Sequence, residues 1–124
     1  MDHATATAIN SYRGAVKLGV LCLEESKTIE AKEHFVRGTA LCVALLDKTP
    51  HLYNVLYHLA LGQLGSQQPD AALATYRGAL NVCSLKGAVL FALLDLQLLK
   101  RSSQAIARLD EAIRLLEPAL HEKV

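Results

Sequence analysis

The chain has 124 residues, of which 52% are hydrophobic and 20% charged, and its formal net charge is +1. This composition excludes a disordered chain, and near-neutral charge with scattered basic residues argues against a nucleic-acid-binding surface. Leu and Ala dominate while Gly and Pro are sparse, so we expect an all-α fold in one domain over residues 1–124.

Helix-start and helix-stop residues divide the chain into six expected helices, at about residues 7–25, 28–47, 50–64, 69–84, 86–100 and 102–116. The expected caps and starts are Thr28, Thr49 followed by Pro50, Pro69 in GSQQPD, and Ser102 or Ser103. Pro118 is expected to disturb or end the last helix. Short connections predict three antiparallel hairpins over residues 7–47, 50–84 and 86–117.

A small residue precedes an aromatic one by four positions in the second and fourth helices, as Ala31…Phe35 and Ala72…Tyr76. Twelve residues upstream of each alanine stand the pairs Leu18-Gly19 and Leu59-Ala60. In the third hairpin the pattern weakens to Ala105…Leu109…Ala112, with Ala92-Leu93 upstream in reversed order of size.

At these residues the chain resembles the tetratricopeptide repeat family, whose unit is a helix–turn–helix of about 34 residues. The resemblance covers roughly Tyr12 to Pro118, and it departs from the family where Ala15 and Leu56 replace an aromatic residue. A related helical-hairpin repeat and an irregular bundle are the alternatives. The tetrapeptide YRGA, at 12–15 and 76–79, offers a rival register in which the first helix takes the part of a second helix.

The resemblance implies a right-handed superhelical array whose first helices line a concave groove for a protein ligand. Helical spacing then predicts these groove residues: Arg13, Val16, Val20, Leu23, Asn54, Tyr57, Leu61, Leu64, Leu90, Leu94 and Gln97. The set is mainly apolar, which argues against a clamp for the acidic tails of chaperones and favours an apolar helix or peptide segment. The alternative is that these residues form the core of a more compact bundle.

The helix expected at 86–100 is apolar over most of its circumference, so a partner, a second copy or further chain is expected to cover it. We therefore expect a non-catalytic adaptor domain that binds another protein. The alternatives are a structural homodimer and a chaperone-like holder of another protein.

No catalytic, metal or cofactor motif accompanies the histidines or the cysteines. Cys22, Cys42 and Cys83 lie in apolar segments, as buried free thiols of a reducing compartment do. The apolar run 85–99 is too short to span a bilayer, and the first ten residues do not resemble a signal peptide. We therefore expect a non-enzyme in the cytoplasm or nucleus, without cofactor and without membrane or nucleic-acid binding.

Overall fold

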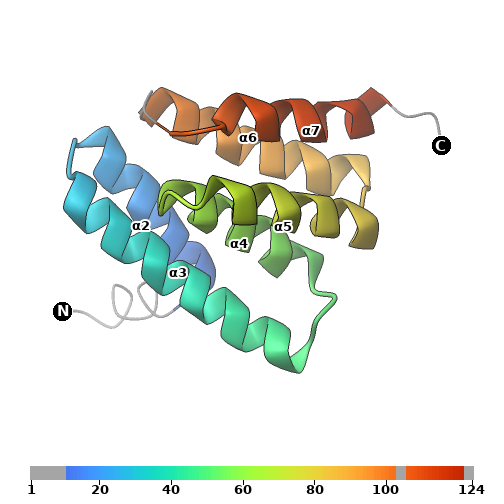
Figure 1. Ribbon diagram of the computed structural model, residues 1–124, viewed down its shortest axis with the longest axis horizontal. Helices are drawn as coiled ribbons and strands as arrows, with labels where there is room; N and C mark the ends of the chain where they lie inside the picture. The colour runs from blue at the N-terminus through green and yellow to red at the C-terminus, as the bar shows by residue number, and fades with distance from the viewer. Residues whose placement is uncertain (1–10, 103–105, 122–124) are drawn as a thin grey trace.

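Six helices make up the regular structure of residues 11–102 and 106–121, which are the parts of the chain that the computed structural model describes (Figure 1). They are α2 (Tyr12–Glu24), α3 (Thr28–Lys48), α4 (Tyr53–Gly65), α5 (Pro69–Val82), α6 (Lys86–Ser102) and α7 (Leu109–His121). No strand occurs within these residues, so the expected all-α class is confirmed. The expected start of the first helix at 7–10 lies outside the described residues.

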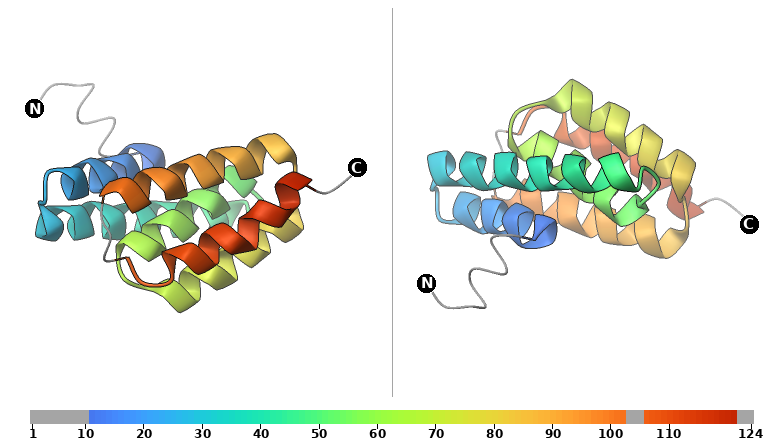
Figure 2. Two further views of the ribbon diagram at one scale, coloured as in Figure 1. Left: turned by 90° about the horizontal axis from the view of Figure 1, so that it is seen from above. Right: turned by 90° about the horizontal axis from the view of Figure 1, so that it is seen from below.

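Consecutive helices pack against each other in pairs, α2 with α3, α4 with α5, and α6 with α7 (Figures 1 and 2). Between the pairs, α3 packs along α4, and α7 packs on α5. The first helices of the three pairs also touch one another, because α6 contacts both α2 and α4 and these two are in contact. The superhelical order implied by the tetratricopeptide resemblance stays a prediction.

The α2–α3 and α4–α5 connections share one backbone geometry. Ser26 and Gln67 have φ angles of 61° and 67°, just past the ends of α2 and α4. In both turns the next N–H donates to the carbonyl five residues back, at 2.8 Å, which is the Schellman pattern. Ser26 and Gln67 are separated by the same number of residues as Ala31 and Ala72. The first two helix pairs are therefore equivalent in the register set by those alanines.

The two YRGA copies do not occupy equivalent positions. Tyr12 is the first residue of α2 and only partly buried, whereas Tyr76 lies in the middle of α5 and is 1% exposed. Their identity therefore does not mark a repeat unit.

Phe35 of α3 lies where the first two helix pairs meet, next to Gly19 of α2 and Gly65 of α4. Its side chain is fully buried, and the position of a Cβ on Gly19 of α2 would lie 2.7 Å from its Cε1. On the other side, a Cβ on Gly65 of α4 would lie 2.5 Å from its Cδ2. The absence of side chains at both glycines therefore lets two helices approach opposite faces of one ring.

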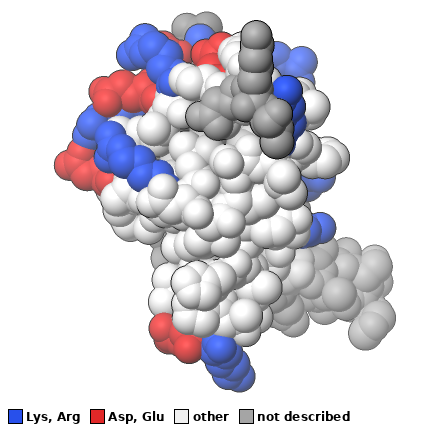
Figure 3. All heavy atoms as spheres, turned by 90° about the vertical axis from the view of Figure 1, so that its right-hand side faces the viewer, with Lys and Arg blue, Asp and Glu red and all other residues white. Residues whose placement is uncertain are grey.

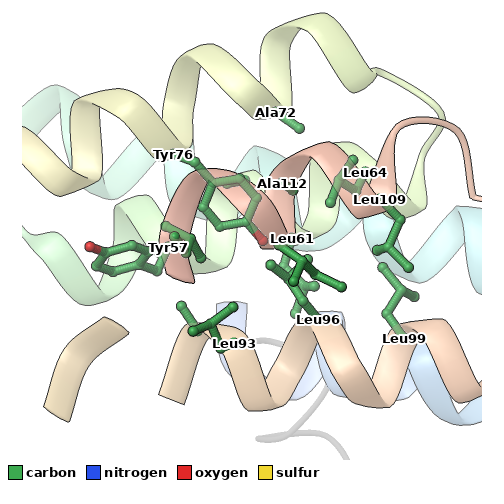
Figure 4. Close-up of a cluster of buried hydrophobic side chains, with 14 of the residues drawn as sticks. Tyr57, Leu61, Leu64, Ala72, Tyr76, Leu93, Leu96, Leu99, Leu109 and Ala112 are labelled. Carbon is green, nitrogen blue, oxygen red and sulfur yellow. The ribbon is translucent and has the colours of Figure 1, made fainter. Parts of the chain in front are cut away.

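The main core contains buried residues of all six helices, and Figure 4 shows the part of it where the second and third pairs meet. Tyr57 of α4 and Tyr76 of α5 lie with their ring centroids 6.3 Å apart, and the Tyr57 hydroxyl donates a 2.7 Å hydrogen bond to the carbonyl of Cys83. Leu96 and Leu99 project from α6 toward them and are fully buried. This core fixes α6 against α4, and so positions the inner surfaces of the first helices.

The expected caps at Thr28 and Thr49 are wrong. Thr28 is the first residue of α3 rather than its cap, since Lys27 holds the cap position. Thr49 ends α3, with its N–H donating to the Leu45 carbonyl at 2.9 Å, and α4 begins only at Tyr53. A residue before proline avoids helical geometry, so Pro50 stops the helix before it instead of starting the one after it.

The last helix also differs from expectation. Ser102 belongs to α6, where its hydroxyl donates to the Leu98 carbonyl at 2.8 Å, and α7 begins at Leu109. Ser103 and Ala105 lie outside the described residues. Pro118 does not end α7, which continues to His121. The buried Ala119 packs into the core and holds this last turn despite the hydrogen bond lost at the proline.

Candidate docking groove

A cavity of about 720 Å³ lies between α2, α4 and α6. Its lining consists of Arg13, Val16, Lys17, Val20, Tyr53, Asn54, His58, Leu61, Leu85, Gly87, Ala88, Phe91, Asp95 and Leu98. No residue of α3, α5 or α7 takes part. The cavity is therefore a groove formed by the first helix of each pair.

The three helices run in the same direction along the groove. Each runs from the side that carries the α3–α4 and α5–α6 connections toward the side that carries the α2–α3 connection (Figures 1 and 2). The Ser102 hydroxyl of α6 donates to the Glu24 carboxylate of α2 at 3.4 Å. The C-terminal ends of α2 and α6 therefore meet at one end of the groove. Tyr53 and Leu85 mark the other end, next to the starts of α4 and α6.

The groove has a buried apolar floor and an exposed apolar rim. Val16, Val20 and Leu61 are at most 4% exposed, whereas Phe91 is 72% and Leu85 71% exposed. The side of the molecule that carries the α3–α4 and α5–α6 connections shows a broad area without charged residues (Figure 3). Exposed apolar side chains that gather at one site, as Phe91 and Leu85 do, are typical of interaction surfaces.

Four polar side chains with ionisable groups also face the groove. Asp95 of α6 is half-buried, and burial raises the pKa of its carboxyl above the ordinary value of 3.8. Attraction by His58 of α4 and by Lys17 and Arg13 of α2 opposes this shift in the pKa. Within the described residues, no cation lies within 4 Å of Asp95. A carboxylate desolvated inside a cavity is costly, and such groups cluster at functional sites.

His58 is held in place by its neighbours. Its Nδ1 lies 2.7 Å from the Asn54 carbonyl, and its ring meets the Tyr12 ring edge-on at 5.3 Å. The Arg13 guanidinium lies 5.8 Å from the centre of the same Tyr12 ring. Because a carbonyl oxygen only accepts, the Nδ1 of His58 carries a proton in this contact.

The structure divides the predicted groove residues into three sets. Those that line the cavity are Arg13, Val16, Val20, Asn54 and Leu61. Those that pack into the core are Tyr57 and Leu64, with the partly buried Leu23 against it. Those exposed on α6 beside the cavity are Leu90, Leu94 and Gln97.

Sequence reasoning missed the inner face of α6, where Phe91, Asp95 and Leu98 are spaced as one helical stripe. The signal available in the sequence was Asp95, the one charged residue of α6 between Lys86 and Lys100. It also missed Lys17 and His58, which lie one helical turn from the predicted Arg13 and Asn54.

A second cavity, of about 500 Å³, lies between the end of α6 and the start of α7. Its charged residues are paired with one another, Lys100 with Asp110 at 2.9 Å and Arg108 with Glu111 at 3.0 Å. Since these charges have partners inside the chain, the groove is the stronger candidate.

Within the described residues, no cysteine, serine or threonine lines the groove. Cys42 is fully buried elsewhere, and burial raises the pKa of its thiol to about 12. Among the described residues, no three His, Cys, Asp or Glu side chains are grouped as metal ligands would be. In the same part of the chain, every helix is too short or too polar to cross a bilayer. What the arrangement can do is bind an apolar ligand beside several charged groups.

Comparison of the chain with protein-family models, with curated proteins and with solved structures finds no match. The resemblance to tetratricopeptide repeats therefore rests on the residues of this chain alone.

Proposed function

We propose that this chain is a non-catalytic protein-interaction domain that binds the apolar face of a partner helix or peptide segment in the groove of α2, α4 and α6. The observation that carries the proposal is the exposure of Phe91 and Leu85, 72% and 71%, at the rim of a buried apolar floor. Fully burying such a side chain contributes about 1.5–3 kcal/mol, so covering both favours docking.

The form of the groove supports a helical ligand. Three parallel first helices surround it, as expected for an array that resembles tetratricopeptide repeats, and it opens along α6 through Phe91. A helix is about 10–12 Å across with its side chains, and it inserts residues spaced by three or four positions into such grooves.

A homodimer through the same surface is the alternative, favoured by the exposure of Leu90 and Leu94, 47% and 53%, beside the groove. Light scattering over a range of concentrations separates the two. A wild-type dimer at all concentrations, converted to a folded monomer by Leu94→Lys, supports the homodimer. A monomeric wild type and a monomeric variant support docking of a different protein. A chaperone-like holder would use the same surface for an insoluble partner.

The test compares Phe91→Glu with Ile29→Glu. Ile29 is 75% exposed on α3 and does not line the groove, so the two variants bring the same charge to equally exposed sites. Amphipathic helical peptides would be selected from a displayed library on the wild-type chain, and their Kd measured by fluorescence anisotropy. We expect Phe91→Glu to weaken binding at least tenfold, about 1.4 kcal/mol, and Ile29→Glu to leave it unchanged.

Unchanged circular dichroism spectra would show that both variants are folded. Equal binding by wild type and Phe91→Glu would refute the groove as the docking site.

A further inference from the structure

The exposed apolar stripe of α6 is framed by basic residues. It consists of Leu90, Phe91 and Leu94, which are 47%, 72% and 53% exposed. Lys86 precedes it in the first turn of α6, and Lys100 and Arg101 follow it in the last turn. The one acidic residue of α6, Asp95, lies one helical turn after Phe91 and lines the groove with it.

This charge pattern opposes a second copy of the chain as the occupant. If two α6 helices paired antiparallel about a two-fold axis, Lys86 of each would lie opposite the Lys100–Arg101 end of the other. If they paired parallel, each basic end would meet itself. Like charges would face each other at both ends in either case, and such pairings are disfavoured.

The opposite wall of the groove is basic as well. Arg13 and Lys17 of α2 are exposed, and their spacing of four residues puts them on one face of the helix. Within the described residues, neither makes an ion pair within 4 Å. Arg13 rests on the Tyr12 ring, with its guanidinium 5.8 Å from the ring centre. Two cations that form no ion pair with the described residues thus line the groove beside its apolar floor.

Asp95 offsets only one of these charges. It lies on the wall facing Arg13 and Lys17, and both attract it. The lining of the groove therefore carries two cations, Arg13 and Lys17, against one carboxylate, and the charge that complements it is negative.

We infer that the partner is an amphipathic helix with carboxylates beside its apolar strip, and that Arg13 and Lys17 pair with these carboxylates while Phe91 and Leu94 are covered. This inference rests on the proposed function and adds the charge of the ligand to it. An anionic bilayer is the other negatively charged surface that could meet such a region. A flat bilayer does not fill a groove whose floor residue Leu61 is 4% exposed, whereas the side chains of a helix do.

The test uses three synthetic helices of about 18 residues, five turns, with one apolar strip in common. The positions flanking the strip are Glu in the first peptide, Gln in the second and Lys in the third. Each exposed charge pair is worth up to about fivefold in affinity. We therefore expect the Glu peptide to bind about five- to 25-fold tighter than the Gln peptide in about 50 mM salt, and the Lys peptide to bind most weakly.

Two double variants locate the effect. Arg13→Gln/Lys17→Gln should abolish the preference for Glu over Gln. The matched control Lys32→Gln/Arg37→Gln removes the same two charges from exposed positions on α3, outside the groove, and should retain it. Raising the salt to about 500 mM should reduce the preference in the wild type.

Each outcome bears on a different claim. Equal binding of the three peptides, or a preference that persists in Arg13→Gln/Lys17→Gln, would overturn the inferred ligand charge and leave the proposed function standing. Failure of all three peptides to bind would overturn both. Binding to phosphatidylglycerol vesicles that depends on Arg13 and Lys17, without binding of the Glu peptide, would replace the helix by a membrane surface.

Discussion

The contact between Gly19 and Phe35 gives a test of packing that does not depend on any ligand. In Gly19→Ala, the new methyl group would lie 2.7 Å from Cε1 and 2.8 Å from Cδ1 of the ring. The ring is fully buried, and Gly65 faces its other side at an equally short distance. Because both faces of the ring are occupied, the clash has to be relieved by moving α2 away from α3.

The size of the effect follows from two opposing contributions. Replacing a helix-interior glycine by alanine stabilises by about 1 kcal/mol through helix propensity. Inserting a methyl group into a close-packed site costs about 1–3 kcal/mol, and the confined ring favours the upper part of that range. We therefore expect Gly19→Ala to lower the free energy of unfolding by about 1–2 kcal/mol.

Gly78 of α5 supplies the matched control. A Cβ at this position would have no atom within 4 Å, and neither glycine has a positive φ that would strain an alanine. Gly78→Ala should therefore raise the free energy of unfolding by about 0.5–1 kcal/mol. Urea denaturation followed by circular dichroism measures both values.

A double-mutant cycle with Phe35→Leu assigns the cost to the ring. In the Phe35→Leu background, Gly19→Ala should become neutral or stabilising, because the atoms that clash are gone. If Gly19→Ala stabilises the wild-type chain as much as Gly78→Ala does, the close approach of α2 to Phe35 is wrong.

Four further outcomes follow from burial. Leu96→Ala should cost about 2–5 kcal/mol of unfolding free energy because its side chain is fully buried, whereas Leu94→Ala, 53% exposed, should cost under about 1 kcal/mol; thermal denaturation compares them. Cys42, whose thiol pKa burial raises to about 12, should react with a chromogenic disulfide at about pH 8 only after denaturation. Asp95→Asn should raise the free energy of unfolding at neutral pH. Folding raises the pKa of the Asp95 carboxyl, so its contribution to stability is fully present below the unfolded pKa and is lost as the pH rises through the folded pKa. Urea titrations at acidic and neutral pH check the sign of this effect. The pKa of the Tyr57 hydroxyl is raised from 10.0 to about 12, so the stability that it contributes is present below pH 10.0 and is lost as the pH rises toward 12. Alkaline unfolding should therefore begin in that pH interval, and tyrosinate absorbance measures it.

Helix-start and helix-stop residues predicted the helix ends correctly where they could be interpreted in one way only. Pro69 starts α5 as predicted, since a proline in the first turn requires no hydrogen bond from its nitrogen. Thr49 and Pro50 were ambiguous, because the same pair can end one helix or begin the next. Pro118 was misjudged because tertiary packing of Ala119, invisible in the sequence, maintains the helix past it.

The candidate groove was predictable in part on α2 and α4, where Arg13, Val16, Val20, Asn54 and Leu61 line it, but not on α6. Leu18-Gly19 and Leu59-Ala60 each place a small residue at a helix contact, and this fixed which neighbouring residues face inward. On α6 the corresponding pair is Ala92-Leu93, and apolar residues surround the helix, so periodicity could not choose the inner face. Core packing decided it, by burying Leu93 and Leu96 and turning Asp95 toward the groove.

Docking in the groove of the first helices is the central claim, and an amide NMR titration with the Glu-flanked peptide tests it most directly. We predict that chemical-shift changes concentrate at groove residues such as Lys17, Asn54 and Ala88, while the exposed Ile29 and Val43 of α3 stay unchanged. Changes confined to α3, or to the outer faces of α5 and α7, with the groove amides unaffected, would contradict the account.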